Sequence, residues 1–199
     1  MKLYSLFIFC LLALNVKAIE VAQKPWPEIS ECNNCIGISI SNIDDILFNF
    51  PKSKLKEVLL LNVDGIGTYF KSKDEWFAKN NEIIFSVLNE SKTTGGLNEN
   101  GYYQKLNVSD ITSFFDEIHT PTQSSKAVKV ARQIMGLNDA SAFVKYQGTK
   151  MNAYWVKSYD MNNQLLYIVP ANHNHVIQLS GAFKEEHINR LLSSFKANK

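Results

Sequence analysis

The sequence predicts an α+β domain in which an antiparallel β-sheet packs with about three to four α-helices. Two observations predict this fold: four segments near the C-terminus have strand-like composition, and an amphipathic helix pattern follows them. Residues 142–147, 152–158, 164–170 and 174–180 are rich in aromatic and β-branched residues, and each connection between them is short enough for a hairpin. We expect a C-terminal meander.

The helix that follows the meander is expected to close the sheet. Ile188, Leu191, Leu192 and Phe195 recur at helical spacing and form one apolar stripe. Such a stripe requires an apolar surface to cover, and the meander would supply it.

The chain begins with the pattern of a secretory signal peptide. Lys2 precedes an apolar core at residues 3–14, and the small residue Ala18 stands where a signal peptidase would cleave. The core is shorter than the roughly 20 residues that span a bilayer. We therefore predict that residues 1–18 are removed by cleavage after Ala18. The mature protein would be periplasmic or secreted, without stable membrane insertion.

The charge balance argues against a nucleic-acid partner. The chain has 21 Lys and Arg residues and 19 Asp and Glu residues. Lys2 and Lys17 fall in the predicted leader, so the mature chain has 19 charges of each sign. It also lacks a basic stripe that could contact phosphates.

Residues 19–35 are predicted to form an extended lead-in to a single α+β domain at residues 36–199. Trp26 lies between two prolines in the lead-in and is expected to dock on the domain. Cys32 and Cys35 are the only cysteines left after cleavage, and an exported chain meets an oxidising compartment. We expect a disulfide between them that plays a structural role.

The N-terminal half of the domain has weaker patterns. Residues 36–41 alternate between apolar and polar and predict a strand, and residues 82–88 predict another. The apolar run at residues 58–63 is consistent with a buried strand or with a short helix, and we favour the buried strand. Residues 44–50 and 73–80 are each expected to form a short helical turn.

The middle of the chain predicts a loop and two helices. Residues 92–101 contain three glycines and are expected to form the most mobile segment. The first helix covers residues 110–118 with Ser109 as its cap. The second starts at Thr122 or Ser124 and runs through Met135. The expected apolar stripe of the second helix is Ala127, Val130, Ala131 and Ile134.

Aromatic and histidine side chains are the predicted partner-binding residues. Tyr and Trp supply contact area at low entropic cost, and both faces of the meander would carry them. Alternatively, the two middle helices cover the second face. The candidate partner-binding residues are Tyr102, Tyr103, Tyr154, Trp155, Tyr159, His173 and His175.

No pattern of residues predicts catalysis, a metal or a cofactor. His173 and His175 could share one face of a strand, and His119 or His187 could complete a metal site, but no cysteine or acidic cluster accompanies the pair. A thiol–disulfide enzyme would place Cys32 at the start of a helix, whereas a strand pattern follows here. We therefore expect a protein that is not an enzyme.

These observations favour a binding function. We expect a periplasmic protein-binding or inhibitor protein, for example an immunity protein that neutralises a toxin or hydrolase directed at the envelope. The meander tips and the 92–101 loop would contact the partner. The alternative is a carrier or sensor of a small apolar ligand, which predicts an enclosed pocket lined by Phe and Leu. A thiol–disulfide enzyme that uses Cys32 and Cys35 is the third hypothesis.

Overall fold

The computed structural model describes residues 19–29, 32–40, 43–62, 66–120, 125–160 and 162–197. The predicted signal peptide at residues 1–18 lies outside the described residues. The strands of the described part are β1 (Glu20–Pro25), β2 (Cys35–Ile40), β3 (Ile43–Pro51), β4 (Leu55–Asn62), β5 (Ile66–Ser72), β6 (Glu82–Asn89), β7 (Ala140–Gln147), β8 (Met151–Ser158), β9 (Gln164–Pro170), β10 (His175–Gly181) and β11 (Phe195–Ala197). The helices of the described part are α1 (Glu90–Thr94), α2 (Tyr102–Leu106), α3 (Ile111–His119), α4 (Lys126–Ile134), α5 (Glu185–Ser193) and a 3-10 turn, η1 (Leu137–Asp139).

The predicted α+β fold, with a meander closed by the C-terminal helix, is wrong. The described chain is mostly strand, and its helices are short. A mixed eight-stranded sheet has the strand order β1-β7-β8-β9-β10-β6-β5-β4, and a three-stranded sheet has the order β11-β3-β2. The segments expected to form the meander are strands β7 to β10, but they make up only half of the large sheet. Strand β1 pairs with β7 in parallel, so the sheet is not purely antiparallel.

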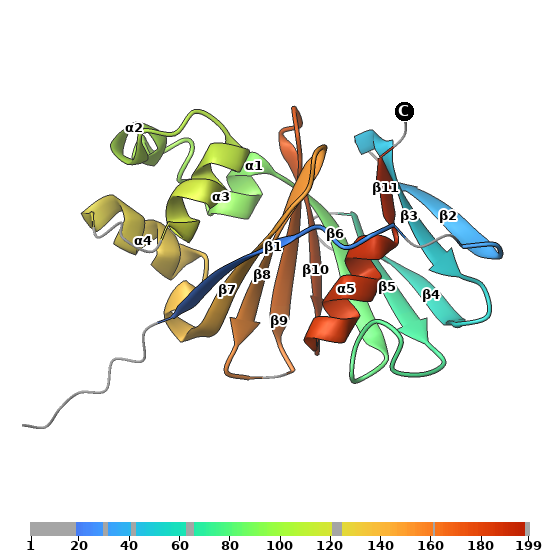
Figure 1. Cartoon of the computed structure of the whole chain (residues 1–199). Helices are drawn as coiled ribbons and strands as arrows, with labels where there is room; N and C mark the ends of the chain where they lie inside the picture. Colours follow the sequence, from blue (N-terminus) through green and yellow to red (C-terminus); the bar gives the residue numbers. More distant parts are fainter. Residues whose placement is uncertain are drawn as a thin grey trace, which may run out of the picture.

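Helix length explains why α5 does not close the sheet. Nine residues of helix are about 14 Å long, whereas eight strands spaced by about 4.8 Å span roughly 34 Å. The small sheet β11-β3-β2 therefore covers the same face together with α5. Ile188 and Leu191 of α5 belong to one buried core with Phe48 of β3. In Figure 1, α5 and the small sheet lie on one side of the molecule and α1–α4 on the other.

Phe48 lies at the centre of this inner core. Its side chain is completely buried. The centroid of its ring lies between 4.7 and 6.1 Å from those of five other phenylalanines. These five residues are Phe50, Phe70, Phe77, Phe85 and Phe195. Phe48 thus joins the small sheet, the large sheet and the C-terminal strand in one apolar cluster.

Helices α1–α4 cover only part of the opposite, outer face of the large sheet. Apolar side chains of α2, α3 and α4 form a second core with Tyr154, Tyr167 and Val176 of strands β8, β9 and β10. Arg132 of α4 donates hydrogen bonds to the carbonyl oxygens at the end of α3, at distances of 2.9 and 2.7 Å. The second face of the meander is therefore covered, which was the alternative interpretation of its aromatic residues.

Three local predictions in the N-terminal and middle parts are wrong. Residues 44–50 lie in strand β3 rather than in a helical turn, because Ile46, Phe48 and Phe50 alternate into the inner core. Residues 73–80 form bends and a turn without a helix. Residues 92–101 were expected to form a mobile loop, but helix α1 begins at Glu90 and extends into this segment as far as Thr94. Thr94 and Leu97 are buried.

The two middle helices differ from prediction in their caps and buried faces. Asp110, rather than Ser109, caps α3, because its side chain accepts the backbone N–H of Ser113. Residues 121–124, where the second helix was expected to start, lie outside the described residues. In α4, Val128 is buried, whereas the side chain of Ile134 is 46% exposed.

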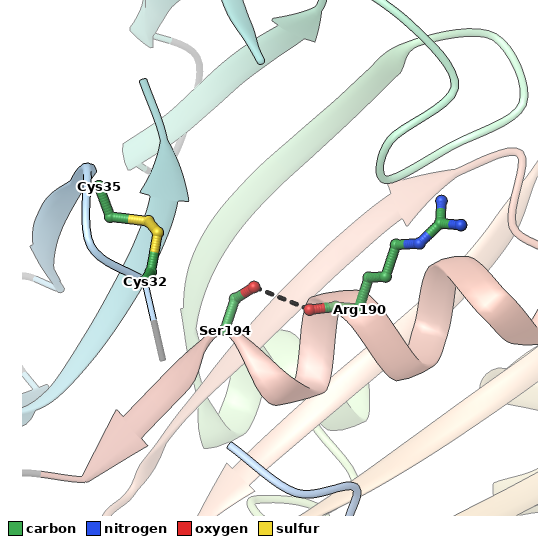
Figure 2. The surroundings of a disulfide bond; sticks show 4 residues. All are labelled: Cys32, Cys35, Arg190 and Ser194. Carbon is green, nitrogen blue, oxygen red and sulfur yellow. Dashed lines mark hydrogen bonds between the residues drawn. A yellow bond between two sulfur atoms is a disulfide. The ribbon is translucent and has the colours of Figure 1, made fainter. Parts of the chain in front are cut away.

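The lead-in is attached to the domain through β1 and Trp26. The Trp26 backbone N–H donates to the carbonyl of Gln147 at 2.9 Å, and its indole packs against the inner core. Cys32 and Cys35 form the expected disulfide, with their Cα atoms 5.7 Å apart. In Figure 2 the disulfide lies beside the small sheet, and the Arg190 side chain of α5 extends away from it. Strand β2 starts at Cys35, so no helix N-terminus activates a thiol here.

Removing this disulfide is expected to have a modest effect on stability. It closes a loop of only four residues, so chain entropy predicts a loss of about 2 kcal/mol in the free energy of unfolding for the Cys32→Ser/Cys35→Ser variant. Urea unfolding with and without reductant measures this loss. Reductant should destabilise the wild type to the same extent and leave the variant unchanged. A loss near zero would show that the disulfide does not constrain the unfolded chain.

Candidate protein-binding surface

Three of the predicted partner-binding aromatics are buried. The Tyr103 hydroxyl donates to Glu90 at 2.7 Å, and the Tyr154 hydroxyl donates to Asp116 at 2.6 Å. The indole N–H of Trp155 donates to Gln164 at 2.8 Å in the inner core. These side chains stabilise the fold and cannot contact a partner directly.

The other predicted partner-binding residues lie on the surface but apart from one another. Tyr102 is half-buried, and Lys105 lies over its ring at 4.5 Å. Tyr159 is 51% exposed and follows β8, whereas His173 and His175 lie at the β9–β10 turn, at the opposite end of the meander. These residues do not form one surface.

The histidines do not gather into a metal site. His173 lines a cavity of about 560 Å³ together with Glu90, Asp110 and Asp116. His119 instead contacts the carbonyl of Ala22 at 3.0 Å. Among the residues that the structure describes, no group of three or more His, Cys, Asp or Glu side chains is placed to hold a metal ion.

A partly exposed charged cluster explains the position of Tyr154. The carboxylate of Asp116 in α3 accepts hydrogen bonds from Tyr154 and from Lys145 of β7. Burial, and then the hydrogen bond to Asp116, raises the pKa of Tyr154. The cluster joins α3 to the sheet, because both donors come from neighbouring strands.

The outer face of the large sheet is uncovered beyond the helices, at strands β4–β6. Strand register places five residues directly opposite one another in a single row across five strands. This outer-face row consists of Leu59, Tyr69, Ile84, Ser180 and Leu165. Leu59 is 47% exposed and Ile84 is 40% exposed. At about 4.8 Å per strand, the row is roughly 19 Å long.

Charged side chains border the outer-face row on one side. Glu57, Lys71 and Glu82 form the neighbouring row on the same face, because successive residues on one face are two positions apart. The ammonium of Lys71 lies 2.6 Å from the carboxylate of Glu82, and this hydrogen bond lowers the pKa of Glu82. An apolar strip with a polar border is typical of protein interfaces.

A small cavity adjoins the far end of the row. It measures about 300 Å³ and lies where Leu165 meets helix α4. Ile134, an exposed residue of α4, lines it. A Cβ at Gly95 would lie 2.9 Å from the Cγ2 of Ile134, and Gly95 has a φ of +61°, so glycine is required at the rim. Tyr167 also lines the cavity, and burial raises its pKa to about 12.

The other end of the row reaches the edge of the large sheet. Strand β4 is the last in the strand order and pairs with β5 alone among the described strands. Its residues Val58 and Leu59 point to opposite faces and are 41% and 47% exposed. An exposed edge with apolar side chains is suited to strand addition by a partner.

The sequence analysis missed this surface although its signal was present. Val58 begins an apolar run in a strand, and we interpreted the run as a buried strand. A run that is apolar on both faces is consistent with a central strand, but the same residues become exposed when the strand lies at an edge.

Comparisons with known proteins do not assign a family. No protein-family model matches the chain, and no curated protein matches it. Among solved structures, the chain is similar to a GTP binding regulator from Thermotoga maritima. The TM-score is 0.30 and the identity is 10%, with 73% of this chain and 79% of that chain covered. A similarity this weak carries no argument about fold or function. In the described part of the chain, every helix is too short or too polar to cross a membrane.

Proposed function

We propose that this chain is an exported protein-binding protein that inhibits its partner. Its partner would be a toxin or hydrolase directed at the envelope, as for immunity proteins. Cleavage after Ala18 would leave the fold intact, because Ile19 packs against the second core, on the outer face of the large sheet, and β1 begins at Glu20. The Cys32–Cys35 disulfide is suited to an oxidising compartment.

The outer-face row is the observation that carries this proposal. Leu59 and Ile84 expose apolar surface on the large sheet, and such exposed patches mark interaction sites. The row lies open on the sheet surface and is bordered by the Lys71–Glu82 ion pair, so it favours a protein partner over an enclosed small molecule. The proposal does not require catalysis, because binding alone would block the partner.

Quantitative capture tests the proposal. The tagged full chain is exported with its leader, and partners that co-purify in stoichiometric amounts are identified by mass spectrometry. Replacing Ile84 or Leu59 with aspartate is expected to weaken binding of the true partner about 30-fold or more, because a charge would be buried in the contact, at the middle of the row for Ile84 and at its end for Leu59. The purified partner's lytic or toxic activity should fall when one equivalent of the wild-type chain is added.

Ile36→Asp is the matched control. Ile36 is 36% exposed but lies in β2 of the small sheet, away from the outer-face row. This variant should bind and inhibit like the wild type, and thermal unfolding should show that all three variants are folded. A partner that binds the Ile84→Asp and Leu59→Asp variants as tightly as the wild type would contradict the proposal. So would a partner whose activity is unaffected by binding.

A further inference from the structure

The small cavity at the end of the outer-face row lies between two helices and the large sheet. On the sheet side it is lined by residues of β6, β9 and β10, among them Leu88, Leu165 and Gln178. On the helix side it is lined by α1 and by the C-terminal end of α4. Leu165 belongs both to the outer-face row and to the cavity lining, so the two are continuous. A protein that covers the row would therefore also cover the cavity.

Two glycines with left-handed backbone conformations form the helix side of the cavity. Gly95 ends α1 with a φ of +61°, and Gly136 follows α4 with a φ of +70°. Glycine adopts this conformation at no steric cost, so the chain can turn sharply at the end of each helix. The cavity is therefore a product of the backbone and does not depend on a ligand.

The cavity lining contains a buried hydroxyl with an unused hydrogen-bond donor. Tyr167 is only 5% exposed. Its hydroxyl accepts a long hydrogen bond of 3.5 Å from the side-chain amide of Gln178, and it donates to no acceptor among the described residues. The carboxamide oxygen of Gln178 likewise accepts no hydrogen bond from the described part of the chain. Because buried polar groups are almost always hydrogen-bonded, this donor and this acceptor suit a bound group that supplies a partner for both.

Four apolar side chains surround this polar pair. They are Leu88, Ile134, Met135 and Leu165. Ile134 is exposed, so an inserted ring would remove apolar surface from water. No described Asp or Glu lines the cavity, so a cationic group would find no partner there. The volume of about 300 Å³ is at the lower end of the range for ligand sites, so the cavity suits one aromatic side chain rather than an extended molecule.

We propose that this cavity receives a tyrosine side chain of the protein partner. The ring would lie against Ile134 and Leu165. Its phenol oxygen would accept the O–H of Tyr167 and donate to the Gln178 oxygen. Tyrosine combines an apolar ring with a group that both donates and accepts, and tyrosines buried in pockets are typical anchors of protein interfaces. This inference rests on the proposed function, because the tyrosine belongs to the partner that would cover the outer-face row.

Titration with p-cresol, the analogue of a tyrosine side chain, tests the cavity without a partner. Methyl NMR spectra of the exported chain should show saturable shifts at Ile134 and Leu165, which line the cavity. The methyl groups of Ile36, in the small sheet, should not respond. Toluene has the same ring and methyl group without the hydroxyl, so it should bind more weakly than p-cresol.

Two substitutions separate the polar and apolar contributions. Tyr167→Phe should weaken p-cresol binding about fivefold and leave toluene binding unchanged, because it removes one hydrogen bond. Its control is Tyr159→Phe, which removes a hydroxyl outside the cavity and should change neither affinity. Ile134→Asp should weaken the binding of both compounds about tenfold. Its control is Ile36→Asp, which should have no effect, and thermal unfolding should show that all four variants are folded.

The captured partner provides the second test. Tyr167→Phe should weaken its binding about fivefold and Ile134→Asp about tenfold, whereas Tyr159→Phe should leave it unchanged. Each surface tyrosine of the partner is then replaced by phenylalanine in turn. One of these replacements should weaken binding to the wild-type chain but not to the Tyr167→Phe variant, because the two hydroxyls form one hydrogen bond.

Three outcomes would overturn this inference and leave the proposed function in place. The first is that p-cresol shows no saturable binding, or binds the wild type and Tyr167→Phe equally. The second is that 4-methylbenzoate binds more tightly than p-cresol, which would assign the cavity to an acidic side chain instead. The third is a partner that is sensitive to Ile84→Asp but not to Ile134→Asp. A chain that binds p-cresol but captures no protein would overturn both the partner tyrosine and the proposed function.

Discussion

Replacing Phe48 with alanine is expected to lower the free energy of unfolding by about 3–5 kcal/mol. The Phe48 ring is fully buried and packs against five other phenylalanine rings, so its removal leaves a cavity where the two sheets and β11 meet. Four of those neighbours lie in four different strands, namely β3, β5, β6 and β11, and Phe77 lies in the bends between β5 and β6, so the site cannot readily collapse. Urea unfolding followed by circular dichroism measures the loss, with the slope of the denaturant dependence expected to stay constant.

Ile36→Ala is the control for this prediction. Ile36 lies in the neighbouring strand β2 but is 36% exposed, so its truncation should cost less than about 1 kcal/mol. If Phe48→Ala cost no more than Ile36→Ala, the small sheet would not share a core with the large one. Two separate unfolding transitions in the wild type would lead to the same conclusion.

Acidification from about pH 7.5 to about pH 5 is expected to destabilise the protein through two buried histidines. Burial lowers the pKa of both His119 and His187. The unfolded chain gains protons on these side chains near pH 6.5, before the folded chain does. The contribution of each histidine is therefore fully present above about pH 6.5 and is lost as the pH falls through its folded-state pKa. The expected slope is at most about 1.4 kcal/mol per pH unit for each histidine.

The surroundings of His187 combine opposing charges. The backbone N–H of Lys184 donates to its Nδ1 at 3.1 Å, while its buried Nε2 has no hydrogen-bond partner among the described residues. Burial is the largest cause of the lowered pKa, and Glu186 and Glu75 oppose it, whereas Arg190 and Lys184 add to it. Protonation would therefore place a charge that is only partly compensated beneath α5.

The surroundings of His119 are different. Burial again comes first in lowering its pKa, and the nearby charge of Lys145 adds to it. Hydrogen bonds to the backbone of Ala22 and Phe143 and the charge of Asp116 act in the opposite direction.

Urea titrations at a series of pH values check this prediction. His187→Gln and His119→Gln should each make the unfolding free energy depend less steeply on pH. Each substitution should remove up to one proton from the number taken up on unfolding, whatever its effect on stability at neutral pH. Glu82 and Asp110 also have lowered pKa values, but carboxylates take up protons near pH 4, below this window. A free energy of unfolding that rises or stays constant as the pH is lowered from about 6.5 to about 5 would contradict the prediction.

Local patterns in the sequence determined where many elements lie. Aromatic and β-branched composition and short connections located the strands that became β7 to β10, and helical spacing located α3 and α5. The disulfide could also be predicted, because only Cys32 and Cys35 remain after the predicted cleavage and they stand three residues apart. These features depend on interactions between near neighbours in the chain, which a single sequence records directly.

The tertiary structure alone decided the sheet and the candidate surface. The parallel pairing of β1 with β7 and the pairing of β11 with β3 join segments far apart in the chain, and neither leaves a local pattern. Tyr154 and Trp155 are both buried, although they point to opposite faces of β8, because a different layer covers each face. Leu59 is exposed although its segment is apolar, because the second core formed by the helices contains no residue of β4. Exposure depends on which layers pack against a strand, and that is set by contacts distant in the sequence.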